Sequence, residues 1–110
     1  MIFRYHEQEE VAQPHFKGGE KELWTKLHAD ENNKILLGRL KPGATVGEHR
    51  HEGTSEVIYA ISGKAVVVDD GVRVEIEAGE GHYCEEGHTH AVINEGPEDF
   101  VFFAVVPTHK

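Results

Sequence analysis

Short runs of apolar residues, separated by glycine, proline and acidic residues, follow one another closely from residue 34 onward. Apolar and polar residues alternate within several of these runs, and no stretch of eleven or more residues has the spacing of an amphipathic helix. The pattern therefore predicts an all-β protein with little helix. The expected strands are residues 23–28, 35–40, 48–51, 55–61, 65–69, 72–77, 82–84, 90–94 and 100–106.

The segments between these runs have the composition of tight turns. Asp70 and Gly71 give the clearest hairpin signal, because they separate two valine-rich runs and a two-residue primed turn needs a positive φ at both positions. The first nineteen residues are mostly polar and contain one proline and two glycines. We expect residues 1–19 to form an arm that covers the domain or exchanges with a partner, and residues 20–110 to form a single domain.

Two of the expected strands are apolar on both faces. Residues 57–61 are apolar at every position, and residues 100–106 contain no polar side chain. A sheet whose outer face met water would carry polar residues on that face. We therefore expect this outer face to be covered, and we predict a homodimer that packs sheet to sheet.

Length and charge narrow the possible partners. A chain of 110 residues suffices for one hydrophobic core, and its net charge of −9 argues against nucleic acid as a partner, because phosphate binding needs a basic surface. No apolar run is long enough to span a membrane, and the first ten residues lack the apolar segment of a secretory signal. The single cysteine, Cys84, excludes an intrachain disulfide. These features predict a cytoplasmic protein with no membrane partner.

The nine histidines are the one unusual feature of the composition, and five of them fall between residues 49 and 90. Side chains two apart on a strand share a face, so His49 and His51 place two imidazoles together while Arg50 points outward. Glu56 follows the intervening turn and can fold back beside them, and His90 begins a later strand. Imidazole is the commonest metal ligand in proteins. In so histidine-rich a chain, however, this set alone is weak evidence for a metal site.

The spacing of these residues relative to glycines is far more specific than the set itself. The order along the chain is Gly43, His49, His51, Glu56 and Gly63, followed by Gly79, Gly87, His90 and Asn94. These two series resemble the two sequence motifs of the cupin superfamily, and the apolar strand that follows extends the resemblance to about residue 106. The chain departs from the second motif at Glu85, where the family usually has proline, and this position is not one of the ligands.

The resemblance implies an antiparallel jelly-roll β-barrel around an interior cavity. It also implies that His49, His51, Glu56 and His90 hold one divalent ion of manganese, iron, nickel, zinc or copper. The donor set supports this independently, because three imidazoles and one carboxylate suit first-row transition metals better than calcium or magnesium. Asn94 is expected to form structural hydrogen bonds rather than to bind the metal.

Two interpretations of function remain open. In the first, the protein is an enzyme that uses an open position on the metal to act on a small polar or carboxylate-bearing substrate, as dioxygenases, decarboxylases and isomerases do. His88 or Tyr83 would then donate a proton, although His88 is equally compatible with an exposed loop, and His82 and Tyr83 with the cavity rim. Cys84 is expected to be a small buried hydrophobic residue. In the second, the protein is a non-catalytic module that binds metal or a small ligand.

Overall fold

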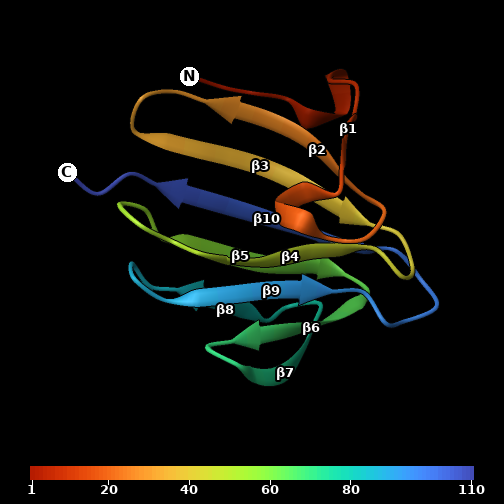
Figure 1. Cartoon of the computed structure of the whole chain (residues 1–110). Helices are drawn as coiled ribbons and strands as arrows, with labels where there is room; N and C mark the ends of the chain where they lie inside the picture. The colour runs from red at the N-terminus through yellow and green to blue at the C-terminus, as the bar shows by residue number, and fades with distance from the viewer.

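The computed structural model describes residues 1–110 and contains ten strands and two three-residue 3-10 helices (Figure 1). Every predicted strand lies within or overlaps an observed one, which confirms the all-β class. The pattern did not predict β1 or the short helices, and none of the helical segments is long and apolar enough to cross a membrane. The elements are η1 (Tyr5–Glu7), β1 (Val11–Pro14), η2 (Phe16–Gly18), β2 (Glu22–Ala29), β3 (Asn33–Leu40), β4 (Thr45–Arg50), β5 (Glu56–Ser62), β6 (Lys64–Asp69), β7 (Val72–Glu77), β8 (Gly81–Cys84), β9 (Thr89–Ile93) and β10 (Phe100–Pro107).

The strands form two antiparallel sheets that pack against each other (Figure 1). One sheet has six strands in the order β1-β2-β3-β10-β5-β8, and the other has four in the order β4-β9-β6-β7. The last strand, β10, pairs with both β3 and β5, so it joins the early and middle parts of the chain. The predicted barrel is therefore a two-sheet jelly roll whose sheets share no strand and are not closed on each other.

The turn between β6 and β7 confirms the predicted hairpin. Asp69 pairs with Val72, which leaves Asp70 and Gly71 as the two central residues. Their φ angles are 47° and 85°, the positive values that a primed two-residue turn requires.

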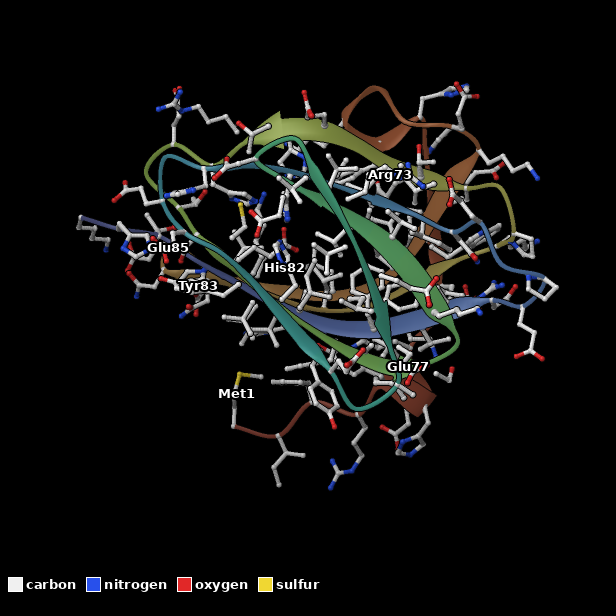
Figure 2. The ribbon with its side chains drawn as sticks, turned by 90° about the horizontal axis from the view of Figure 1, so that it is seen from below. Met1, Arg73, Glu77, His82, Tyr83 and Glu85 are labelled. Atoms are coloured by element: carbon white, nitrogen blue, oxygen red, sulfur yellow. The ribbon has the colours of Figure 1, made fainter.

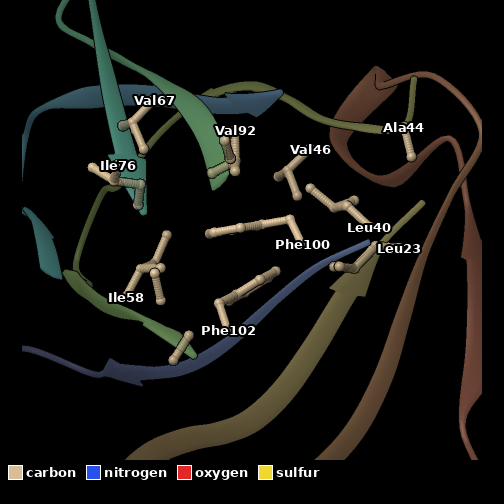
Figure 3. Packing of buried hydrophobic residues seen from close by; sticks show 13 residues of the cluster. Leu23, Leu40, Ala44, Val46, Ile58, Val67, Ile76, Val92, Phe100 and Phe102 are labelled. Carbon is tan, nitrogen blue, oxygen red and sulfur yellow. The ribbon is translucent and has the colours of Figure 1, made fainter. Parts of the chain in front are cut away.

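The hydrophobic core lies between the two sheets (Figure 3). Phe100 and Phe102 alternate along β10, point inward and stack with ring centroids 5.4 Å apart. A Cβ at Gly38, on the neighbouring strand β3, would lie 2.3 Å from the ring of Phe102. Glycine at position 38 thus lets an aromatic ring lie flat against the sheet.

The N-terminal residues lie against the same chain's six-stranded sheet. β1 pairs with β2, and the Tyr5 hydroxyl donates a hydrogen bond of 3.0 Å to the carbonyl of Ile35. Phe3 stacks on His28 at 5.7 Å, on the outer face of that sheet. The division into an arm of residues 1–19 and a domain of residues 20–110 stays a prediction.

Candidate metal centre

The four residues with the predicted ligand spacing come together between the two sheets. His49 lies on β4 and His90 on β9, where they are direct cross-strand partners. Strand β4 ends at Arg50, so His51 lies one residue beyond it, held by a backbone hydrogen bond of 3.0 Å to the carbonyl of His88. Glu56 is the first residue of β5 and comes from the opposite sheet. The cluster therefore spans the gap between the sheets.

The donor atoms of these side chains converge on one point. The Nε2 atom of His90 lies 3.0 Å from Nε2 of His51 and 3.1 Å from Nε2 of His49. The Oε1 atom of Glu56 lies 3.2 Å from Nε2 of His51 and 3.1 Å from Nε2 of His90. His51 and His90 are buried, and His49 and Glu56 are partly buried. Nitrogen lone pairs at these separations repel one another unless a proton or a cation lies among them.

The spacing fits a first-row transition metal ion. Two donors at right angles around an ion with bonds of about 2.1 Å stand about 3.0 Å apart, whereas tetrahedral neighbours stand about 3.4 Å apart. The observed separations of 3.0 to 3.2 Å are nearer to the right-angled arrangement. Three imidazoles and one carboxylate also have the intermediate softness that such ions prefer. The cluster thus has both the geometry and the chemistry of a metal-binding site.

The opposite nitrogen of each imidazole has its own partner, which orients the ring. Nδ1 of His49 donates to the Gly47 carbonyl at 2.8 Å, so the lone pair of His49 is on Nε2 and faces the cluster. Nδ1 of His51 lies 2.9 Å from Oγ1 of Thr54, a hydroxyl that can accept or donate. Nδ1 of His90 lies 3.1 Å from Nε2 of His82.

The surroundings also set the charge of the cluster. Burial opposes ionisation of Glu56, but the adjacent imidazoles of His51 and His90 outweigh it and lower the pKa of the carboxyl to about 2. Burial lowers the pKa of His49 below its usual value, although the hydrogen bond to Gly47 opposes this shift. At neutral pH the site therefore offers an ionised carboxylate and a neutral His49 imidazole, the protonation states that metal binding requires.

A cavity of about 410 Å³ extends from the cluster between the sheets. Polar and apolar residues both line it, and the segment around η2 contributes Phe16 and Lys17. The cationic side chains of the lining are Lys17, Lys34 and Arg50, and the last of these lies 3.6 Å from the Glu52 carboxylate. The apolar lining residues are Phe16, Leu23, Leu27, Leu36, Val46, Ile58, Val92, Phe102 and Val106.

The structure does not bring His88 or Tyr83 to the cavity. His88 is partly exposed and pairs with the carboxylate of Asp70, whose hydrogen bond raises the pKa of His88. Tyr83 lies on the outer face of β8 and is 55% exposed. Neither residue is among those that line the cavity.

The remaining candidates have structural surroundings. Cys84 is buried, and burial raises the pKa of its thiol to about 11. The side chain of Asn94 is also buried, donates to the carbonyls of Leu40 and Glu98, each at 2.8 Å, and accepts from the Gly96 amide at 3.0 Å. Asn94 thus has the hydrogen-bonding role expected of it. His82, which the sequence pattern left undecided, faces inward from β8 and contacts His90, a contact that no sequence spacing signalled.

Comparisons with known proteins relate this chain to one protein family and to several similar proteins. A family model described as cupin domain matches residues 36–106. An oxalate-binding protein from Thermotoga maritima is 39% identical over 80 residues, which cover 71% of this chain and 66% of that protein. The crystal structure of a predicted oxalate decarboxylase from Thermotoga maritima is 29% identical, with a TM-score of 0.93 over 98% of this chain and 99% of that one. A cupin 2 conserved barrel domain protein from Salinispora arenicola is also 29% identical, with a TM-score of 0.69 over 76% and 74% of the two chains.

Proposed function

This chain belongs to the cupin domain family, and on that premise we propose that it holds one divalent transition metal ion between His49, His51, Glu56 and His90 and binds a small carboxylate there. The observation that carries the proposal is the convergence of three Nε2 atoms and one carboxylate oxygen, each of which lies 3.0 to 3.2 Å from at least one of the other three. Manganese, iron, nickel, zinc and copper are the candidate ions. When bound, such an ion would act as a Lewis acid on a substrate oxygen or as a redox centre.

The site favours a small substrate that carries two carboxylates. A dianion needs a positive partner for each carboxylate, because an unpaired charge against an apolar wall is costly. A single ion at the cluster can partner both carboxylates only where both reach it. Oxalate, whose two carboxylates are directly bonded, would do so in a five-membered chelate ring, whereas succinate would need a seven-membered ring. The other cations of the lining are Lys17, Lys34 and Arg50, and Arg50 is already 3.6 Å from the Glu52 carboxylate.

The relatives support a carboxylate of this kind. One is named an oxalate-binding protein, and another a predicted oxalate decarboxylase. The aligned part covers 66% of the oxalate-binding protein, so its ligand is carried over here as a proposal and not as a property of this chain.

Catalysis and binding without turnover are the two forms of this proposal. In the catalytic form, the protein is a metal-dependent decarboxylase, dioxygenase or isomerase, in which Glu56 and the three histidines hold the ion and the apolar wall excludes water. The second candidate, a non-catalytic carboxylate-binding module, is favoured by one observation: His88 and Tyr83, the expected proton donors, do not line the cavity.

Calorimetric titration tests the carboxylate proposal. Protein loaded with Mn²⁺ or Ni²⁺ is titrated with oxalate, malonate and succinate, and metal-free protein serves as the control. We expect oxalate to bind the loaded protein most tightly and the metal-free protein not measurably. Equal binding of oxalate with and without metal would contradict the proposal. Release of carbon dioxide or uptake of oxygen from bound oxalate would then distinguish an enzyme from a binding module.

We also propose that the protein is a homodimer that buries the outer face of the six-stranded sheet. Val57, Tyr59 and Ile61 project from β5 on this face and are 47%, 50% and 46% exposed, and Tyr83 extends the patch. These side chains carry no charge, which favours their burial between two copies of an otherwise strongly acidic chain. Residues 3–5 already cover part of the same face, against His28 and Phe103. A cytoplasmic location stays a prediction.

A further inference from the structure

His82 lies behind one of the proposed metal ligands and is not itself one of the four. It is on β8, opposite Ile58 of β5, and its side chain crosses from the six-stranded sheet towards β9 of the other sheet. Nε2 of His82 lies 3.1 Å from Nδ1 of His90, and the two rings are inclined at 28° with centroids 5.3 Å apart. Figure 2 shows His82 between the strands, whereas its neighbour Tyr83 lies further out.

The contact determines which nitrogen of His90 carries the proton. Nε2 of His90 faces the other donors, so it can bind a cation only if its lone pair is free and the proton is on Nδ1. The hydrogen-bond partner that the structure gives this Nδ1 is Nε2 of His82. The hydrogen bond between these two nitrogens contains one proton, which belongs to Nδ1 of His90, so Nε2 of His82 must accept it. The neutral ring of His82 then has its own proton on Nδ1.

Without His82, the proton of His90 would be more stable on Nε2, the nitrogen that must bind the metal. The Oε1 atom of Glu56 lies 3.1 Å from Nε2 of His90, and this carboxylate would attract the proton to the position that a metal must occupy. A buried Nδ1–H without an acceptor would also be costly. We propose that His82 is a positioning residue that holds His90 in its Nδ1–H tautomer and so keeps Nε2 ready for the metal.

One other role for His82 uses the same atoms. A nitrogen of His82, a nitrogen of His90 and the sulfur of Cys84 lie within 4.8 Å of one another, so these three residues could bind a soft cation themselves. The burial of Cys84 favours its neutral thiol over the thiolate that such a site needs. The positioning role requires no change at Cys84, and the two roles give different spectra.

Three variants test the proposal, which rests on the proposed metal site. His82→Leu removes the acceptor, and His82→Gln supplies an amide oxygen that reaches towards the position of the lost Nε2. His6→Leu is the control, because His6 is exposed and does not line the cavity. Thermal unfolding of all variants checks the fold. Long-range ¹H–¹⁵N NMR of the imidazoles reports the tautomer of His90 in metal-free protein, and titration with Ni²⁺ or Co²⁺ reports affinity.

The metal-free wild-type protein should have His90 in the Nδ1–H form, and His82→Leu should shift it to the Nε2–H form. Affinity for the ion should fall about 10- to 100-fold in His82→Leu, recover in His82→Gln and stay unchanged in His6→Leu. The same His90 tautomer and the same affinity in folded His82→Leu would overturn the proposal. Equal losses in His82→Leu and His82→Gln, or a thiolate-to-cobalt absorption that Cys84→Ser abolishes, would overturn it in favour of ligation. Failure of the wild-type protein to bind any ion would instead refute the proposed function, because the NMR measurement needs no metal.

Discussion

Replacement of Gly47 by alanine tests how the N-terminal segment forms the cavity. A Cβ at position 47 would lie 2.0 Å from the carbonyl oxygen of Lys17 and 2.8 Å from the amide nitrogen of Gly19. An ordinary contact begins at 3.4 Å, so the Lys17 carbonyl would have to retreat by about 1.4 Å. These are backbone atoms, and no rotation of a side chain relieves the clash. The variant must therefore displace η2 from β4, or bend β4 itself.

The cost follows from the contacts that hold this segment. Overpacking against rigid surroundings costs about 1–3 kcal/mol. The displaced segment also strains two hydrogen bonds, from the Thr45 amide to the Glu20 carbonyl at 3.0 Å and from the Glu20 amide to the Thr45 hydroxyl at 2.8 Å. Each contributes about 0.5–1.5 kcal/mol. We expect Gly47→Ala to lower the free energy of unfolding by about 2–4 kcal/mol, which corresponds to a fall in Tm of roughly 9–17 °C.

Urea denaturation followed by tryptophan fluorescence measures this difference, with Gly81→Ala as the matched control. Gly81 also lies in a strand without a positive φ, but its added Cβ would meet only the Ile58 carbonyl at 3.4 Å. We expect Gly81→Ala to stay within about 0.5 kcal/mol of the wild type. Equal stability of the two variants would refute the close approach of η2 to β4. The same displacement would move Phe16 and Lys17 away from the cavity, so Gly47→Ala should also weaken carboxylate binding.

Three further measurements test other parts of the structure. Asn94→Ala should cost about 2–4 kcal/mol in chemical denaturation, since it removes the partner of the buried Leu40 carbonyl and of the less buried Glu98 carbonyl and Gly96 amide. It should leave metal affinity unchanged, and a tenfold loss of affinity would contradict the structural role. Hydrogen bonding to Arg39 lowers the pKa of Glu10. The stability that the Glu10 carboxylate contributes is therefore fully present above the pKa of the unfolded carboxyl and is lost as pH falls through the lower pKa of the folded protein. Glu10→Gln should lower the free energy of unfolding by about 0.5–1 kcal/mol at pH 7, and a difference that does not change with pH would contradict this. Light scattering should give about twice the chain mass of 12.3 kDa, and Tyr59→Glu should give the monomer; a wild-type monomer would refute the dimer.

The sequence predicted much of the fold because its signals are local. Strands alternate with a period of two, and turns require particular residues, so the hairpin at Asp70 and Gly71 could be placed from two residues alone. The cluster of His49, His51, Glu56 and His90 could be predicted because the spacing of these residues relative to glycines is long and specific. β1 was missed because it has four residues and ends in Pro14, so it carries almost no periodic signal.

The features that the sequence did not predict depend on contacts between segments far apart in the chain. Adjacent residues on a strand face opposite sides, so one of His82 and Tyr83 had to point inward, but only the pairing of Tyr83 with Val57 on the outer face decides which. The partnership of His88 with Asp70 joins a loop to the tip of a hairpin eighteen positions earlier. Such pairings follow from register and packing between strands, and sequence periodicity does not specify them.

Metal analysis of the purified protein tests the central claim most directly. The protein is prepared without an affinity-tag metal, loaded with Mn²⁺, Ni²⁺ or Zn²⁺, freed of excess ion by gel filtration and analysed by mass spectrometry of the elements. Wild-type protein and the exposed-site control His6→Ala should each retain about one ion per chain, whereas folded His51→Ala and His90→Ala should retain little. Wild-type protein that retains no ion, or His51→Ala that retains as much as wild type, would contradict a metal centre formed by His49, His51, Glu56 and His90.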